Sequence, residues 1–171
     1  MSQSTIYFSD NFFSTGVTSI YNEAKEEVGS LDLKSAFTSS IEVLNDAGVI
    51  VMKGHFPIFS RRWQVSDGND NEVGLLKQRL SFFTKKYEYD ARNRGIYTIV
   101  SEAFSREFQI EDANGALVAE FKRINGFFQS PAFQLKNGSE NLSNEELIAV
   151  VMGVNMIIKR NRAAASNNAG R

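Results

Sequence analysis

Apolar and polar positions recur along this chain with a nearly constant spacing. A Phe is followed four residues later by a second apolar residue, and one polar residue then separates this one from a third. Four segments share the spacing, namely 37–43, 59–65, 83–89 and 104–110, and they begin 22, 24 and 21 residues apart. Weaker copies precede and follow them. A repeat of this length indicates that one supersecondary unit is used several times.

Each copy leads into a segment in which apolar and polar residues alternate, turn, and alternate again. In the clearest example, residues 108–121, the turn contains Asp112, Asn114 and Gly115. Alternation with period two is typical of a half-buried strand, and Asn and Gly tolerate the positive φ of a tight turn. Each unit is therefore predicted to be a β-hairpin, and six units give about twelve strands.

The links between hairpins carry cations at an awkward position. If residues 59–63 formed one straight strand, Arg61 would lie on the same face as Phe59 and Trp63. Lys85 and Arg106 occupy the equivalent position in later copies. A straight strand would bury these cations, at a cost of about several kcal/mol each. We therefore expect either a bend or a rim open to water. The links are predicted to lie at one end of the sheet and the Gly turns at the other.

The C-terminal segment differs in kind from the repeats. Ser143 and Glu146 form a capping box, in which the Ser side chain bonds a free amide and the Glu reaches back. Apolar residues then run from 147 to 158 on every side, interrupted only by Asn155, and the cations Lys159, Arg160 and Arg162 follow. This pattern predicts a buried helix over residues 144–162, followed by a flexible tail at 163–171.

The length of the apolar stretch decides where this helix lies. Its span is about 18 Å at about 1.5 Å per residue, whereas a bilayer core needs about 30 Å. A closed barrel of twelve strands has a lumen too wide for side chains alone, and a helix about 10 Å across fits it. We therefore predict a mainly β fold, a closed antiparallel barrel of about twelve strands with this helix buried through its centre.

Composition narrows the function classes. The chain has 171 residues, which we interpret as one domain over 1–162 plus the tail, and its net charge of −1 argues against a nucleic-acid partner held by bulk charge. The absence of Cys excludes disulfides, a thiolate nucleophile and Cys-based zinc sites. The N-terminal residues lack the pattern of a signal peptide, so we expect a cytoplasmic location.

The order of these elements resembles the tubby C-terminal-like superfamily, and its LURP-one-related branch in particular. Three segments carry the resemblance, Phe59–Val65, Phe108–Gly115 and Ser143–Arg162, within roughly residues 6–162. It implies a barrel threaded by an apolar helix. The superfamily also includes phospholipid scramblases and tubby itself, which binds phosphoinositides at a cationic surface. The residues of that lipid site have no matched positions in this chain, so none is carried over.

Candidate chemistry is sparse. His55 is the only His, and a lone His at the end of a strand is usually structural. No Gly-rich phosphate loop is present, and residues 67–72 offer oxygen ligands without the spacing of a calcium loop. We therefore expect no catalytic residue, no metal and no cofactor, and a protein that is not an enzyme.

Charge is distributed unevenly along the repeats. The cations fall at the links, namely Arg61, Arg62, Lys85, Lys86 and Arg106. The acids fall near the Gly turns, namely Asp46, Asp67, Asp70, Glu72, Asp90, Glu111 and Asp112. If the links share one end, that end is a basic rim able to bind anionic phospholipid headgroups at about 1 kcal/mol per cation. The plainer interpretation is that these cations only keep strand ends soluble.

These observations favour a binding module over an enzyme. The first hypothesis is recognition of anionic headgroups or a membrane surface by the basic rim, which would place the protein peripherally at a membrane. The second is a protein-interaction or scaffold domain that uses exposed edges or aromatic patches. The third is a barrel that carries a small apolar ligand, and the buried helix counts against it because the helix would occupy the cavity.

Overall fold

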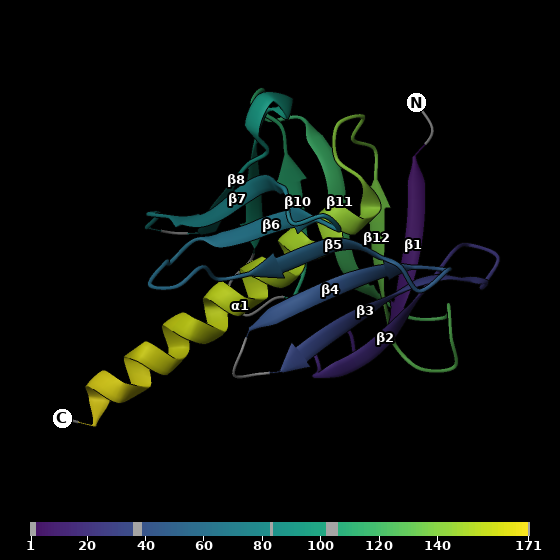
Figure 1. Cartoon of the computed structure of the whole chain (residues 1–171), viewed down its shortest axis with the longest axis horizontal. Helices are drawn as coiled ribbons and strands as arrows, with labels where there is room; N and C mark the ends of the chain where they lie inside the picture. Colours follow the sequence, from purple (N-terminus) through teal and green to yellow (C-terminus); the bar gives the residue numbers. More distant parts are fainter. Residues whose placement is uncertain (1–2, 36–38, 83, 102–105, 171) are drawn as a thin grey trace.

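The computed structural model describes residues 3–35, 39–82, 84–101 and 106–170, and these form a closed β-barrel with one long helix (Figure 1). The strands are β1 (Ser4–Ser9), β2 (Gly16–Tyr21), β3 (Glu27–Ser35), β4 (Ser40–Asn45), β5 (Ile50–His55), β6 (Trp63–Asp67), β7 (Glu72–Arg79), β8 (Lys85–Asp90), β9 (Ile96–Ser101), β10 (Phe108–Glu111), β11 (Leu117–Ile124) and β12 (Ala132–Asn137). A short 3-10 helix, Arg92–Arg94, joins β8 to β9, and α1 (Asn144–Ala169) follows β12. The predicted barrel of about twelve antiparallel strands is confirmed.

Every strand pairs with its neighbours in the chain, and β1 closes the barrel by pairing with β12. Because consecutive strands are antiparallel, their connections alternate between the two ends of the barrel. The connections β1–β2, β3–β4, β5–β6, β7–β8, β9–β10 and β11–β12 lie at one end, which we call the link end. The other connections and the start of α1 lie at the opposite end, which we call the turn end. This separation of links from Gly turns is the one that the sequence predicts.

Three turns at the turn end share one construction. Side-chain oxygens of Asn45, Asp67 and Asp112 each accept hydrogen bonds from the backbone amides two and four residues further on. The residue three positions on has positive φ in each case, namely 73° at Gly48, 67° at Asp70 and 80° at Gly115. An Asx side chain that caps a turn of this type fixes the register of the hairpin.

In the copy of the repeat at residues 59–65, the first and second apolar residues lie in opposite environments. Phe59 precedes β6 and is fully exposed, with φ at 60°, whereas Trp63 is completely buried as the first residue of that strand. The chain therefore bends between them, as the position of Arg61 requires. Phe37, Phe83 and Phe104 of the other copies lie outside the described residues.

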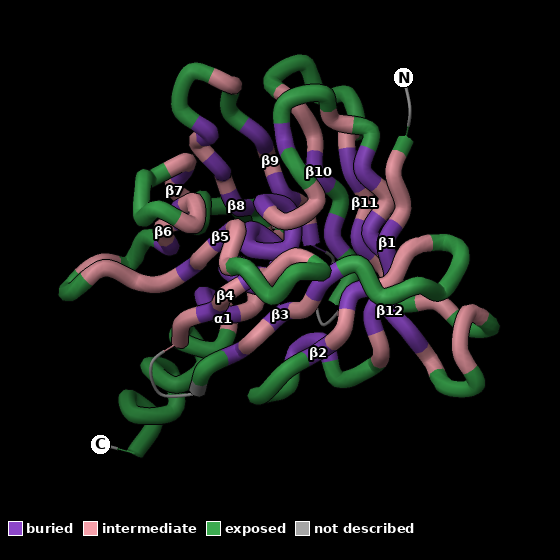
Figure 2. Tube along the Cα trace, turned by 45° about the vertical axis from the view of Figure 1, so that its right-hand side comes forward, coloured by how far each residue is buried: buried purple, intermediate pink, exposed green. Residues whose placement is uncertain are grey.

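Helix α1 passes through the barrel from the turn end to the link end. Residues 146–154 are all buried, and Ser143 caps the helix by accepting a hydrogen bond from the Glu146 amide at 3.1 Å. The Glu146 carboxylate does not complete the predicted capping box, because it binds Arg94 and Tyr89 across the lumen. The helix continues to Ala169 rather than ending near 162, and residues 159–170 project into solvent (Figure 2).

The helix packs mainly against the wall formed by β4 to β7. There the indole of Trp63 lies between two glycines, Gly54 of β5 and Gly153 of α1, and donates a hydrogen bond of 3.1 Å to the Ala149 carbonyl. A side chain at either glycine would overlap the ring. The small residues at 149 and 153 therefore allow the close approach of one bulky side chain.

The opposite side of the lumen is filled by aromatic rings. Neighbouring rings stand 4.6–6.1 Å apart between centroids, and the cluster consists of Phe8, Phe12, Phe13, Phe108, Phe121 and Phe133. Phe12 and Phe13 come from the β1–β2 connection and fold into the barrel. The helix therefore shares the lumen with this cluster, a feature that the apolar pattern of α1 alone does not predict.

Candidate functional site: the basic link end

The structure brings the five cations singled out from the sequence to the same end of the barrel. Arg61 and Arg62 lie in the β5–β6 connection, Lys85 and Lys86 open β8, and Arg106 lies two residues before β10. These positions belong to three successive connections of the link end. Arg61, Arg62, Lys86 and Arg106 are exposed, and Lys85 is half-buried.

The projecting part of α1 adds further cations to this end. Arg160 donates to the Ser60 carbonyl at 2.7 Å and lies over the Phe56 ring, 4.1 Å from its centroid. Asn161 donates to Gln78 at 2.6 Å. These contacts fasten the emerging helix to the β5–β6 connection and to β7. Lys159, Arg160 and Arg162 therefore extend the basic link end, which settles a point that the sequence leaves open.

A groove of about 730 Å³ lies between the β5–β6 connection, the end of β7 and the emerging helix. Its cationic lining residues are Arg61, Arg62, Lys77, Arg79 and Arg160. Lys77 and Arg79 share one carboxylate, that of Glu88, at 2.9 and 3.3 Å. Among the residues that the structure describes, neither Arg61 nor Arg62 forms a salt bridge. Their charges are therefore available to an anion.

A smaller hollow of about 220 Å³ lies on the other flank of the helix. Lys85 and Arg162 both line it, together with Tyr87 at its base. Burial raises the pKa of the Tyr87 hydroxyl, and the nearby Arg162 acts weakly in the opposite sense. The emerging helix thus has cations on both of its flanks where it leaves the barrel.

The turn end has the opposite character. The seven acids expected near the Gly turns lie in its turns or beside them, at Asp46, Asp67, Asp70, Glu72, Asp90, Glu111 and Asp112. Hydrogen bonds from Asn71 hold the pKa of Asp67 below its ordinary value, so this side chain is firmly ionised. Arg92 and Arg94, two cations of the β8–β9 connection at this end, are both engaged by carboxylates, those of Glu72 and Glu146.

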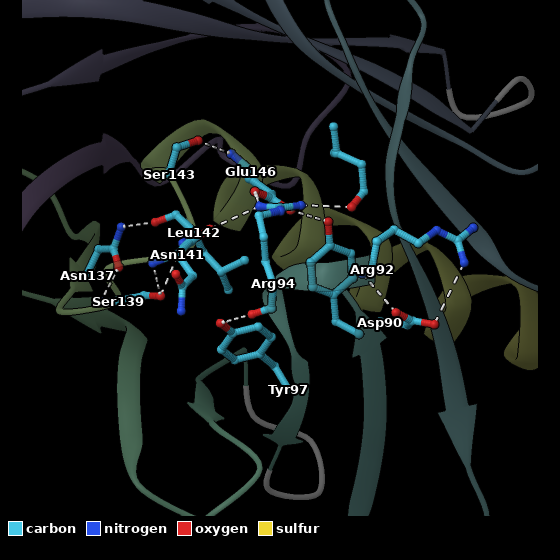
Figure 3. A network of polar contacts seen from close by, with 12 residues as sticks. Asp90, Arg92, Arg94, Tyr97, Asn137, Ser139, Asn141, Leu142, Ser143 and Glu146 are labelled. Carbon is cyan, nitrogen blue, oxygen red and sulfur yellow. Dashed lines mark hydrogen bonds and ion pairs between the residues drawn. The ribbon is translucent and has the colours of Figure 1, made fainter.

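The Arg94–Glu146 pair fastens the start of α1 to the barrel (Figure 3). Arg94 donates to both carboxylate oxygens, at 2.6 and 2.8 Å, and to the Val73 and Asn141 carbonyls. The Tyr89 hydroxyl donates to the same carboxylate, and burial raises the pKa of Tyr89 well above its ordinary value. Glu146 is only 3% exposed. Every polar atom of this carboxylate is therefore satisfied, and the network is an anchor for the helix rather than an open site.

Sequence reasoning missed two parts of the link end. Lys77 and Arg79 lie in the second half of β7, outside the Phe-led segments of the repeat, so the spacing of the repeat does not single them out. The groove itself depends on where α1 emerges, because Arg160 forms one of its walls. The run of cations at 159–162 was the available signal, but a helix can leave a barrel at either end.

Two further findings bear on candidate chemistry. Within the described ranges, no group of three or more His, Asp or Glu side chains is placed to hold a metal ion. Of the helices that the structure describes, none combines the length and the apolarity needed to cross a membrane.

Comparison with known proteins agrees with this architecture. The family model of the LURP-one-related proteins matches residues 5–151. The X-ray structure of an Arabidopsis thaliana protein superposes with a TM-score of 0.62 and 13% sequence identity, over 93% of this chain and 91% of that one. No curated protein matches the sequence. The match to the plant structure concerns the fold alone, and the family match supports a tubby-like barrel domain. The chain belongs to the LURP-one-related family.

Proposed function

We propose that this protein is a non-enzymatic binding module that recognises anionic phospholipid headgroups on a membrane surface through its link end. One observation carries the proposal, the gathering of Arg61, Arg62, Lys85, Lys86 and Arg106 at the same end as the cations of the emerging helix. The seven acids of the Gly turns lie at the opposite end of the barrel. This separation of charge orients the molecule in the field of an anionic membrane although its net charge is only −1.

The strength of such binding follows from the number of cations that reach the surface. Each Lys or Arg near an anionic leaflet contributes about 1 kcal/mol, so five of them contribute about 5 kcal/mol. The attraction falls off within a Debye length, about 8 Å at physiological ionic strength. Binding should therefore weaken as salt is raised, and it should depend on the fraction of acidic lipid.

Co-sedimentation with vesicles tests the proposal. We expect binding to phosphatidylcholine vesicles that contain phosphatidylserine and none to phosphatidylcholine alone. Loss of two cations in Arg61→Ala/Arg62→Ala should weaken binding about 30-fold, from about 1 kcal/mol per residue. The control Lys25→Ala/Lys136→Ala removes the same charge from the turn end and should bind like the wild type. Absence of binding at low salt, or equal weakening in both double variants, would refute the proposal.

The two alternatives have less support. A carrier of an apolar ligand needs lumen space, but α1 and the Phe cluster occupy it. A protein-interaction domain would bind its partner without any requirement for acidic lipid. The vesicle assay separates this alternative from the proposal, since only lipid recognition predicts that the Arg61 and Arg62 variant loses binding in the absence of other proteins.

A further inference from the structure

The link end exposes large apolar side chains to an unusual degree. Ile58 is 87% exposed, Phe59 103%, Leu80 106% and Phe82 100%. They are the four most exposed large apolar residues in the described part of the chain. The next most exposed on the same scale are Val17 at 62% and Leu117 at 57%. Scattered exposed apolar residues need no explanation, but a group of fully exposed ones marks an interaction site.

These residues lie close together around the link end. They occupy two connections, β5–β6 and β7–β8, that are neighbours around the link end. Phe59 and Leu80 line the same groove as Arg61 and Arg62. We call Ile58, Phe59, Leu80 and Phe82 the apolar tips. At the turn end, by contrast, the exposed apolar residues such as Val49 and Ile96 are only about half exposed, at 56% and 49%.

Hydrogen bonds fix the conformation of the β5–β6 connection around Phe59. The Ser60 amide donates to the Pro57 carbonyl at 3.0 Å, and the Arg62 amide donates to the Ser60 hydroxyl at 3.0 Å. Arg160 of α1 donates a hydrogen bond to the Ser60 carbonyl. Phe59 lies between these contacts with φ at 60°, a conformation that costs a bulky residue free energy. The fold thus maintains a strained backbone that points an aromatic side chain into solvent.

Both connections present their residues in the same order. Two apolar tips come first and two cations follow, as Ile58, Phe59, Arg61 and Arg62 in one and as Leu80, Phe82, Lys85 and Lys86 in the other. Segments 56–62, 80–86 and 158–170 contain no Asp or Glu. A bilayer offers the matching layers, with anionic headgroups above apolar chains. In Figure 1 the β7–β8 hairpin and the end of α1 extend on the same side of the barrel, so one surface can meet both.

We propose that the apolar tips penetrate the interfacial region of an anionic bilayer while Arg61, Arg62, Lys85 and Lys86 bind headgroup phosphates behind them. The link end is then a shallow membrane anchor and not only a charged surface that adsorbs. Penetration adds apolar burial to the electrostatic attraction. This inference rests on the proposed function and adds to it the depth of the bound state, so binding without penetration refutes the inference alone.

Fluorescence quenching by lipid-attached bromine measures that depth. The only Trp, Trp63, is buried in the lumen, so wild-type emission should be unchanged by vesicles whose acyl chains are brominated near the headgroup. Phe59→Trp places a second indole at a tip, and its added emission should fall several-fold on the same phosphatidylserine-containing vesicles. A variant that co-sediments with these vesicles but shows no quenching refutes penetration and leaves lipid recognition standing. Failure of the wild type to co-sediment refutes both.

A pair of double variants provides a second readout. Phe59→Ser/Leu80→Ser should weaken vesicle binding at least tenfold and make the remaining binding more sensitive to salt, since only the charge contribution is left. Val49→Ser/Leu117→Ser removes two exposed apolar side chains from the turn end and should bind like the wild type. Because all four positions are exposed, the melting temperatures should differ little from the wild type. Equal binding of the tip variant and the wild type would assign the tips to a protein partner and overturn the inference.

Discussion

Gly153→Ala adds one methyl group at the closest contact between the helix and the barrel. A Cβ at this position would stand 2.4 Å from Trp63 Cδ1 and 2.6 Å from Nε1. The indole cannot retreat, because a Cβ on Gly54 across the ring would stand only 2.5 Å from Cζ2, which leaves no room on that side. The ring is also fixed by its hydrogen bond to the Ala149 carbonyl. The variant must therefore shift α1 away from the β5–β6 wall.

Favourable and unfavourable effects together set the change in unfolding free energy of Gly153→Ala. Replacing Gly by Ala in a helix interior favours the helix by about 1 kcal/mol. Overpacking a rigid core costs about 1–3 kcal/mol, and the upper value applies here because both faces of the ring are closed. Loss of the Trp63 hydrogen bond adds about 1 kcal/mol. The net destabilisation is about 3 kcal/mol, which lowers the melting temperature of a domain of this size by about 6–12 °C.

Urea unfolding followed by far-ultraviolet circular dichroism measures this change in every variant, and a mutant cycle identifies its cause. With Trp63→Phe in place, Gly153→Ala should cost at least about 1 kcal/mol less, because the smaller ring leaves room for the methyl group. Gly138→Ala is the matched control, since its Cβ would meet only the Val118 carbonyl at 3.5 Å, an ordinary contact. If Gly153→Ala is as stable as the wild type, or if the two substitutions are additive, the helix does not pack on Trp63 as described.

Three further predictions concern the helix. Val151 is completely buried, so Val151→Asp should abolish soluble folding, as judged by the soluble fraction on expression. Glu146→Gln leaves Arg94 without its ionic partner and should lower the unfolding free energy, measured by urea unfolding, by about 3 kcal/mol. This value is near the lower end for breaking a buried ion pair, because the Arg94 side chain is 30% exposed. Because burial raises the pKa of Tyr89, the stability that its protonated hydroxyl contributes is complete below pH 10 and is lost as pH rises further. Tyr89→Phe should show a smaller fall in unfolding free energy between about pH 9 and 11, and an equal fall would contradict this account.

The barrel could be predicted because its repeat spans two strands. Each unit carries its own alternation and its own turn residues, so the assignment does not depend on any one segment. The Asx turns at Asn45, Asp67 and Asp112 are visible in the sequence because their hydrogen bonds are local. The placement of the link cations at one end follows from antiparallel pairing alone.

The missed features depend on contacts between distant residues. Glu146 fits a capping box locally, but Arg94 lies 52 positions away and gives the carboxylate a stronger, charged partner. The continuation of α1 past Arg162 follows contacts that hold the emerging helix at the barrel rim, where Arg160 bonds Ser60 and Asn161 bonds Gln78. The inward fold of Phe12 and Phe13 follows from the space that a single helix leaves in the lumen.

The same two-strand period explains why the chemistry of this protein lies at one end. In an up-and-down barrel, substitutions in one class of connection always face the same side, so charge can be polarised without altering a strand. The capped turns fix the register of their hairpins, so their sequences must keep the capping Asn or Asp and a residue that tolerates positive φ. The links carry no such caps in the β5–β6 connection, where Ser60 and Arg160 hold the chain instead. A longer link is therefore free to present apolar tips and cations together, provided that the helix emerges beside it and braces it.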